Sequence, residues 1–288
     1  MNFEALVPPN IKETVKLWIE EDLPLLDVGG YVVGDKEEIG HLLCKSSCTM
    51  AGRPWAQATY DYFGLEVEWK HADGDVFECT EQQKKHIVAI VKGPCRKILM
   101  AERVSLNVLS RASGVATATA VAVAIKNREN WNGEVAGTRK TTPGLRAVEK
   151  YSLIVGGGST HRNDLSQMVM LKDNHIWSCG DITKAVTKAK SAAGFSMKVE
   201  VECQSVEEAW TAAAAGAEVV MLDNFDPKDI GNAALKVKEK YPNVIVEASG
   251  GITQDTMHLF MDSNVDVISR GNLTQGYPCI DFSLKIQR

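Results

Sequence analysis

The residues with the most evident chemistry lie between positions 137 and 175. The stretch opens with Gly-Thr-Arg-Lys-Thr-Thr-Pro-Gly, continues through His161, and closes with Lys-Asp-Asn-His. Four cations stand where short apolar runs end: Arg139, Lys140, Arg162 and Lys172. Guanidinium groups bind planar carboxylates or phosphates through paired hydrogen bonds. The stretch therefore predicts a pocket for a polyanion, with a solvated loop that carries several cations as the alternative.

Composition narrows the class of protein. The chain has 288 residues, 44% of them hydrophobic and 24% charged, which suits one large or two ordinary globular domains. A net charge of -5 argues against a broad nucleic-acid surface, so an anion site must be local. No apolar run approaches the roughly 20 residues of a membrane helix, and the N-terminus has no signal-peptide pattern. We therefore expect neither a nucleic acid nor a membrane as a partner.

The seven cysteines are odd in number and mostly lie within apolar segments, as Cys203 and Cys279 do. They predict reduced thiols of a cytoplasmic protein, and we include the nucleus as a second expected compartment. Cys44 and Cys48 have a loose metal-binding spacing, but no second cysteine or histidine pair completes a zinc site. Zinc is therefore not expected.

The first part of the chain has the pattern of an α+β domain. Asn10 predicts the cap of an amphipathic helix with the buried stripe Ile11, Val15, Trp18 and Ile19. Further elements are expected as strands at 39–44, 65–69 and 86–91 and as helices at 55–63 and 96–127. Gly114 is a candidate break in the last helix. Arg103, among apolar neighbours, is interpreted as a helix arginine that extends its charge to water.

After Trp131, strands alternate with helices. Apolar strand candidates cover residues 134–138, 168–171, 198–202, 219–222, 244–248 and 266–269. Helical segments are expected at 182–193, 206–215 and 230–240. This alternation predicts a parallel sheet, either open or closed into a barrel. No Gly-x-Gly-x-x-Gly follows the first strand and no Gly-Lys-Ser/Thr loop occurs, so dinucleotide and P-loop sites are excluded.

The ends of these strands are chemically distinctive. In chain order they carry Arg139 and Lys140, Lys172, Glu202, Asp223, Ser249 to Gly251, and Gly271 with Asn272. Ligands of parallel α/β proteins bind at the carboxyl ends of the strands, so we expect these groups to share one site.

Two glycine-bearing strand ends predict a phosphate site. Ser249, Gly250 and Gly251 precede a helix expected near Thr253, so their backbone N–H groups could bind phosphate. Gly271 would supply the other half of this site, as in barrel phosphate sites. A plain strand-to-helix turn is the alternative.

Two carboxylates on neighbouring strands, Glu202 and Asp223, suit Mg²⁺ or the hydroxyl groups of a sugar. A buried ion pair with Lys140 or Lys172 is the alternative for either of them. Glu200 lies on the same side of its strand as Glu202, so internal pairing is also an interpretation for Glu200.

The motifs resemble one family over nearly the whole chain. The strings are Ala-Gly-Thr-Arg-Lys-Thr-Thr-Pro-Gly, Lys-Asp-Asn-His, Val-Glu-Val-Glu-Cys, Leu-Asp-Asn-Phe and Glu-Ala-Ser-Gly-Gly-Ile. They resemble the quinolinate phosphoribosyltransferases, with a pattern similar to eukaryotic, fungal members. The resemblance implies a phosphoribosyl transfer from phosphoribosyl pyrophosphate to quinolinate with decarboxylation. The products would be nicotinate mononucleotide, pyrophosphate and CO₂, a step of de novo NAD synthesis.

The resemblance also implies an architecture. It consists of an N-terminal open-faced α/β sandwich, residues 1–113 joined by 274–288, and a C-terminal incomplete α/β barrel of parallel strands, residues 114–273. It implies a homodimer with a shared active site, with assembly into a hexamer left open. Arg103 would enter the site of the partner subunit, which replaces its interpretation as a solvent-directed arginine.

The same resemblance assigns roles. Quinolinate would be bound by Arg103, Arg139, Lys140, His161, Arg162 and Lys172. The phosphoribosyl group would be bound by Glu202, Asp223, Ser249, Gly250, Gly251 and Gly271. Lys140, Glu202 and Asp223 are expected to be catalytic, and the two carboxylates to hold Mg²⁺ together with phosphoribosyl pyrophosphate. Arg270 departs from the family, whose members carry smaller or uncharged residues beside the phosphate glycine.

The expected chemistry needs no side-chain nucleophile. The pyridine nitrogen attacks the ribosyl carbon as pyrophosphate leaves, and the resulting pyridinium lets the 2-carboxylate leave as CO₂. A proton then returns to C2, with Lys140, His161 and water open as its donor. Two rival classes are an enzyme of this fold with another acceptor base and a non-catalytic phosphosugar-binding protein.

Overall fold

The computed structural model describes residues 3–287 and separates into two compact units. The first takes its described residues from Met1–Ala120, Thr142–Gly157 and Gly276–Arg288, and the second comprises Val121–Thr141 and Gly158–Gln275. The domain boundaries expected from the sequence stay a prediction. The compact units differ from them chiefly by grouping residues 142–157 with the first unit.

The first unit is built on a four-stranded antiparallel sheet with the order β12-β1-β5-β3. Its strands are β1 (Glu37–Cys44), β3 (Glu66–Trp69), β5 (His86–Pro94) and β12 (Phe282–Ile286). The short strands β2 (Cys48–Thr49) and β4 (Val76–Phe77) form a separate pair. Its helices are η1 (Phe3–Leu6), α1 (Ile11–Asp22), α2 (Val28–Val33), α3 (Arg53–Tyr62), α4 (Cys95–Arg128) and α5 (Arg146–Val155). The strands and helices expected here are confirmed, with shifts of up to three residues at their ends.

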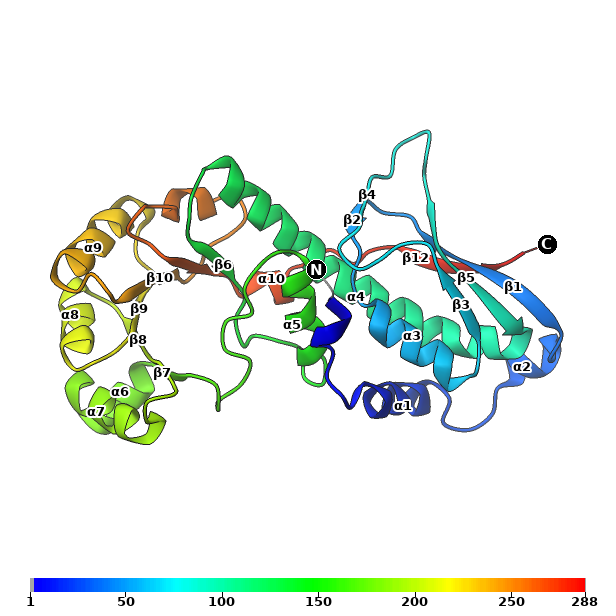
Figure 1. The fold of residues 1–288 in the computed structure, drawn as a ribbon, viewed down its shortest axis with the longest axis horizontal. Coiled ribbons are helices and arrows are strands. Elements are labelled where there is room, and N and C mark those ends of the chain that lie inside the picture. The colour runs from blue at the N-terminus through cyan, green and yellow to red at the C-terminus, as the bar shows by residue number, and fades with distance from the viewer. Residues whose placement is uncertain (1–2, 288) are drawn as a thin grey trace. The chain divides into compact units, whose positions relative to one another are not determined.

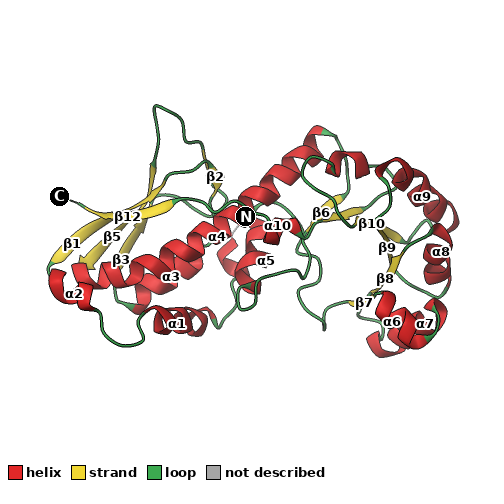
Figure 2. Cartoon of the chain, turned by 180° about the vertical axis from the view of Figure 1, so that it is seen from behind, coloured by secondary structure: helices red, strands yellow, loops and turns green. Residues whose placement is uncertain are grey.

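The C-terminal strand belongs to this first sheet. β12 pairs antiparallel with β1, with Leu284 opposite Leu42, and both side chains are buried. This pairing gives the open-faced layer of sheet and helices visible in Figures 1 and 2. The last described residues therefore pair with the first sheet, in the place where the resemblance expects them.

Helix α1 begins at Ile11, as predicted, but Asn10 does not cap it with its side chain. Asn10 has φ -90° and ψ 20°, outside the extended conformation that directs a cap side chain back to the helix amides. Val15 and Ile19 are buried, whereas Trp18 is only partly buried. The predicted stripe is thus correct in position and overestimated in burial.

Helix α4 runs without a break through Gly114, so the break predicted there is wrong. A Cβ at Gly114 would lie 2.2 Å from the carbonyl oxygen of Pro278, so this glycine allows a close chain approach.

Among the described residues, α4 is the one helix long and apolar enough to span a membrane. The expectation that no such run exists is therefore wrong. Half of that apolar window is buried inside the protein, where residues such as Leu109 pack into the core.

The second unit contains a six-stranded parallel sheet with the order β6-β11-β10-β9-β8-β7. Its strands are β6 (Glu134–Ala136), β7 (Val169–Leu171), β8 (Val199–Cys203), β9 (Val219–Asp223), β10 (Ile245–Ser249) and β11 (Val267–Ser269). The helices are α6 (Asp173–Cys179), α7 (Ile182–Ala193), α8 (Val206–Ala214), α9 (Pro227–Lys240), η2 (Met257–Phe260) and α10 (Asn272–Gln275). Figure 1 shows the strands as an arc with α6 to α9 outside it, which is an incomplete α/β barrel. The predicted fold class is confirmed.

The helix expected near Thr253 is absent from the described residues. The Thr253 amide donates to the Thr256 hydroxyl at 3.0 Å, and the Thr256 amide donates back to Thr253 at 3.3 Å. These reciprocal bonds have the form of a capping box, but the chain continues through a turn into the short η2 rather than into an α-helix. The phosphate site therefore has to rely on the glycine backbone rather than on a helix N-terminus.

Asp73 makes the stability of the first unit pH-dependent. Its carboxylate accepts from the Tyr151 hydroxyl at 2.5 Å and the Arg53 amide at 3.2 Å. Burial raises the pKa of Asp73 to about 6, against the opposing effect of these hydrogen bonds. Because the folded pKa is above the unfolded one, ionisation costs stability as the pH rises through about 6. Between pH 5 and 7.5 the wild type should lose about 1–2 kcal/mol relative to Asp73→Asn. Urea unfolding of both proteins at the two pH values measures this, and parallel pH profiles would contradict it.

Candidate active site

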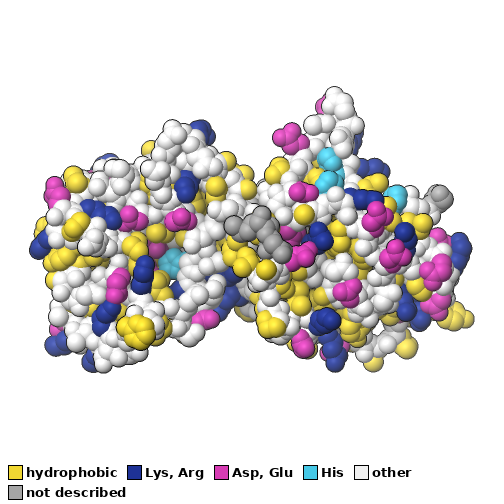
Figure 3. All heavy atoms as spheres, in the orientation of Figure 1, with side chains coloured by type: hydrophobic (Ala, Val, Ile, Leu, Met, Phe, Trp, Pro, Cys, Tyr) yellow, Lys and Arg dark blue, Asp and Glu magenta, His cyan; other side chains and the backbone are white. Residues whose placement is uncertain are grey.

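The carboxyl edge of the parallel sheet collects the predicted residues on one face. Strand pairing places Glu202 beside Met221 and Met221 beside Glu247, and it places Asp223 beside Ser249. Since side chains alternate between the two faces of a strand, these acidic and hydroxyl groups share a face. Figure 3 shows acidic and basic side chains around a histidine in a hollow of this unit.

The two predicted arginines are close enough to repel each other. Arg162 is 9% exposed, and one of its guanidinium nitrogens donates to the Met168 carbonyl at 3.1 Å. Burial lowers the pKa of Arg162, and the charge of Arg139 lowers it further. Arg139 Nε is buried without a hydrogen-bond partner among the described residues. Two converging guanidiniums, one with an unused donor, favour a site for an anion.

Lys172 forms an ion pair with Glu202. This pair is the alternative considered for Glu202, and the structure contains it. Lys172 remains 46% exposed, so its ammonium can also face a ligand at the open edge. Asp223 accepts from the side-chain amides of Asn224 at 2.5 Å and Gln204 at 3.4 Å rather than from a lysine. Both carboxylates lie at strand ends, as predicted.

Gly250 and Gly251 have left-handed backbones with φ of 93° and 63°. A Cβ at Gly250 would lie 2.3 Å from Asn224 Oδ1 and 2.7 Å from the Asn224 amide nitrogen. No side chain other than glycine fits this turn without displacement. The turn keeps its backbone open to a ligand, which is the property a phosphate site needs.

Lys140 reaches the second predicted glycine. A Cβ built at Gly271 would lie 2.8 Å from Lys140 Cδ and 3.6 Å from its Nζ. The Thr274 hydroxyl donates to the Lys140 carbonyl at 2.8 Å, which fixes the backbone of Lys140 against α10. The ammonium group thus lies beside the expected phosphate loop, whereas the resemblance assigned it to quinolinate binding and to catalysis.

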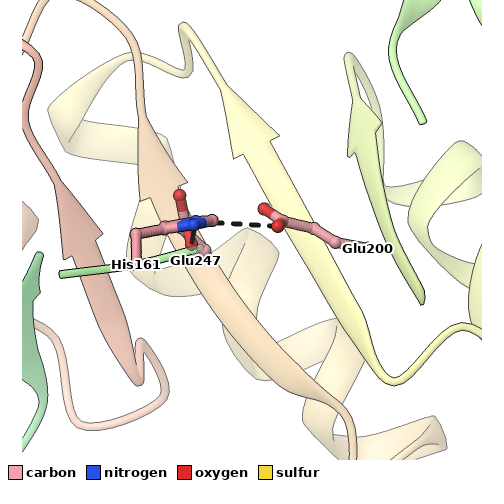
Figure 4. A group of neighbouring side chains, drawn as sticks. All are labelled: His161, Glu200 and Glu247. Carbon is pink, nitrogen blue, oxygen red and sulfur yellow. Dashed lines mark hydrogen bonds and ion pairs between the residues drawn. The ribbon is translucent and has the colours of Figure 1, made fainter. Parts of the chain in front are cut away.

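His161 lies in a buried cluster with Glu200 and Glu247 (Figure 4). Its Nε2 is 3.1 Å from Glu247 Oε2 and 3.6 Å from Glu200 Oε2. Its Nδ1 accepts from the Arg162 backbone amide at 2.7 Å. A neutral imidazole that accepts at Nδ1 must carry its proton on Nε2, directed at the carboxylates. Such a ring donates to Glu247, whereas a metal-bound Nε2 would require a proton on Nδ1, where the amide already points.

Glu200 is fully buried, and neither carboxylate oxygen has a hydrogen-bond partner among the described residues. Burial raises the pKa of Glu200 well above its usual range, and the charge of Glu247 raises it further. The pairing of Glu200 with a lysine, which the sequence left open, is replaced by proximity to His161. The positive charges of Arg162 and Lys172 lower the pKa of Glu200, so both cations lie near the cluster.

The sequence did not indicate Glu247 and Ser269. Glu247 is 2% exposed and Ser269 is 3% exposed, and the Ser269 hydroxyl donates to Glu247 Oε1 at 2.5 Å. The available signal was a charged residue inside an apolar strand, two positions before Ser249 and therefore on the same face.

Arg270 is buried, and its guanidinium contacts Asn272 and Met257. Its Nε donates to Asn272 Oδ1 at 3.1 Å, and it contacts the Met257 sulfur at 3.2 Å. Asn272 in turn donates to the Ile252 carbonyl at 3.4 Å. The unusual arginine therefore bonds to Asn272, which links the two glycine-bearing loops.

Arg103 belongs to the first unit, unlike the other predicted site residues. Its exposed side chain lines a cavity of about 600 Å³ together with Trp18, Glu21, Asp22, Arg111 and Tyr277. No ion pair or hydrogen bond joins the Arg103 side chain to another described residue. This arginine is consequently available to an external anion.

The fold is that of a parallel α/β barrel enzyme, and the charged groups at the carboxyl edge of its sheet suit anionic substrates. The family description "Quinolinate phosphoribosyl transferase, C-terminal domain" matches residues 115–285, and the corresponding N-terminal domain matches residues 27–113. The chain therefore belongs to the quinolinate phosphoribosyl transferase family.

Individual relatives agree with this assignment. The chain is 46% identical to the nicotinate-nucleotide pyrophosphorylase [carboxylating] of Dictyostelium discoideum over the full length of both, and 45% identical to that of Homo sapiens over 98% of this chain and 93% of the human one. A nicotinate-nucleotide pyrophosphorylase structure from Francisella tularensis superimposes with a TM-score of 0.88, at 32% identity and 98% coverage of each chain. The expected likeness to eukaryotic members is confirmed, and the narrower likeness to fungal members stays a prediction.

Proposed function

We propose that this protein transfers the phosphoribosyl group of phosphoribosyl pyrophosphate to quinolinate with decarboxylation. The products are nicotinate mononucleotide, pyrophosphate and CO₂. The observation that carries this proposal is the convergence of cations and glycine loops at one sheet edge, in a chain that matches both domains of the family.

Quinolinate is a dianion and needs cations in a fixed arrangement. Arg139 and Arg162 lie close to each other, and Lys172 directly follows strand β7. In our proposal these groups bind the two carboxylates and hold the pyridine nitrogen toward the ribosyl carbon. Binding the two anions together removes most of the entropic cost of their encounter.

The phosphoribosyl group is proposed to bind at the two glycine loops. Gly250 and Gly251 offer open backbone to the 5-phosphate, with Ser249 and Gly271 beside them and the Lys140 ammonium close by. The oxygen donors of Glu202 and Asp223 suit Mg²⁺, which would neutralise the charge of the departing pyrophosphate when bound there. Glu202 would then exchange its pairing with Lys172 for the incoming cation and sugar.

Carbon dioxide leaves from C2 and a proton replaces it. Both ring nitrogens of His161 are already engaged, one by the Arg162 amide and one by Glu247. This occupancy argues against His161 as the donor and supports Lys140 or water.

The deciding experiment mixes the protein with carboxyl-labelled quinolinate, phosphoribosyl pyrophosphate and Mg²⁺. Labelled CO₂ and pyrophosphate should be released in a one-to-one ratio. Release of pyrophosphate with another base in a substrate panel would favour a different acceptor. Binding of phosphoribosyl pyrophosphate without turnover would favour a non-catalytic sensor.

The active form is proposed to be a homodimer in which Arg103 serves the site of the partner subunit, and a hexamer of such dimers is compatible with this. A cytoplasmic location, with the nucleus as a second compartment, and the absence of nucleic-acid and membrane partners belong to the same proposal. Gel filtration with light scattering tests the assembly.

Gly250 allows the two halves of the site to be separated. Gly250→Ala places a Cβ against Asn224 and strains a left-handed backbone. It should therefore weaken the binding of phosphoribosyl pyrophosphate far more than the binding of quinolinate. Calorimetry with each ligand measures both losses. Gly216→Ala is the matched control, because Gly216 also has a positive φ, 103°, and has open space around it. A larger loss for quinolinate in Gly250→Ala would contradict the placement.

A further inference from the structure

One buried carboxylate contacts both halves of the proposed site. Glu247 Oε2 accepts from His161 Nε2 at 3.1 Å, and Glu247 Oε1 accepts from the Ser269 hydroxyl at 2.5 Å. Ser269 Oγ also lies 3.0 Å from Ser249 Oγ. His161 adjoins Arg162 on the quinolinate side, and Ser249 is the first residue of the phosphate loop. Glu247 is therefore the central member of a hydrogen-bonded chain that joins the two sides.

The direction of each hydrogen bond in this chain is fixed. The Arg162 amide donates to His161 Nδ1, so Nε2 carries the proton and donates to Glu247. The single hydroxyl proton of Ser269 cannot serve both Glu247 and Ser249, and the carboxylate at 2.5 Å is the closer and charged acceptor. Ser249 is therefore the donor in the 3.0 Å contact between the two hydroxyl groups. Both arms thus end as donors on one carboxylate. Glutamine, the uncharged residue of the same size, cannot replace Glu247 in both hydrogen bonds. Its amide oxygen accepts, but its amide nitrogen only donates.

The backbone of His161 explains why such support is needed. Its φ is 56°, a left-handed conformation that is uncommon and costly outside glycine. A residue in this conformation persists when its surroundings hold it, and the bond to Glu247 is a charge-assisted one. Without it, the His161 ring would lose the partner of its Nε2 hydrogen, and the Arg162 amide would lose an acceptor that is held in place.

We propose that Glu247 is a positioning residue for the transfer reaction, which holds His161 on the quinolinate side and Ser249 on the phosphate side in one hydrogen-bonded chain. The inference rests on the proposed function. Glu247 has no role in the chemistry itself in this proposal. Its effect is to keep the two anion-binding halves in register with each other.

The test compares three variants by steady-state kinetics with each substrate varied at saturation of the other. Glu247→Gln keeps the shape but offers only one acceptor and no negative charge, so one arm must break or reverse and the remaining bond loses its charge assistance. We expect kcat/KM to fall about 10- to 100-fold for both substrates. Ser269→Ala removes only the phosphate-side arm, so kcat/KM should fall about tenfold for phosphoribosyl pyrophosphate and stay unchanged for quinolinate. This one-sided loss is a readout that a general packing role would not produce.

Glu218→Gln is the matched control. Glu218 lies just before β9, at the amino end of the strand and away from the carboxyl edge. There it pairs with Lys190 and accepts from the Val199 amide. The same substitution there should leave both kcat/KM values unchanged. Circular dichroism confirms that each variant is folded. If Glu247→Gln does not fold, Glu247→Asp, which keeps two acceptors on a shorter stem, should show the two-sided loss in milder form.

Two results would overturn the inference. One is an unchanged kcat/KM for either substrate in folded Glu247→Gln, and the other is an equal loss for both substrates in Ser269→Ala. A failure of the proposed function is distinguishable, because the wild type itself would then release no CO₂ from quinolinate.

Discussion

Quinolinate should be used at least about 10⁴-fold more efficiently than nicotinate, as measured by kcat/KM with saturating phosphoribosyl pyrophosphate. Nicotinate lacks the 2-carboxylate, so its binding would leave cations of the site without a partner. Arg162 is 9% exposed, and Arg139 Nε is buried and unpaired among the described residues, so neither charge can recover its hydration fully. A site built around buried polar groups rejects a ligand that fails to satisfy them.

Pyridine-2-carboxylate is the matched control for this prediction. It keeps the carboxylate that would leave as CO₂ but lacks the 3-carboxylate, and it should also be a poor substrate. If nicotinate and quinolinate have comparable kcat/KM values, the cations do not select a dicarboxylate. The proposal that Arg139, Arg162 and Lys172 bind quinolinate would then be wrong.

The sequence predicted the second sheet well because each parallel strand is a short apolar run with a chemically distinct end. Asp223, for example, ends β9, and Lys172 directly follows β7. Residue type and position along the strand were sufficient there, since the fold brings all carboxyl ends to one edge. The same logic failed at Thr253, where the pattern predicted a helix and the chain forms a turn followed only by the short η2.

The interior of the site was less accessible to sequence reasoning. Glu247 is one glutamate among many until strand register places it beside Met221 and within reach of His161. Its partner Ser269 lies on another strand, 22 positions away, so no local spacing connects the two. Gly114 shows the same limit, because its role depends on a chain segment near Pro278 that is distant in sequence.

The active site is expected to be shared between subunits, which a mixing experiment can detect. Arg103 lies in α4, in the unit that contains none of the other proposed site residues, and its side chain is exposed with no polar partner among the described residues. Lys172 lies in the unit that holds the parallel sheet. Loss of a charge-paired contact costs about 2–5 kcal/mol, so Arg103→Ala and Lys172→Ala should each be nearly inactive while still folded and dimeric.

Mixing the two inactive variants should restore activity if Arg103 serves the partner's site. In a statistical mixture half of the dimers contain one subunit of each kind. Each mixed dimer then has one site with both residues intact and one site that lacks both, because a two-fold dimer presents two equivalent sites. About a quarter of wild-type activity should return after subunit exchange. Exchange is verified with two affinity tags on the two variants, and either variant alone is the control. If mixed dimers form and no activity returns, Arg103 acts within its own chain.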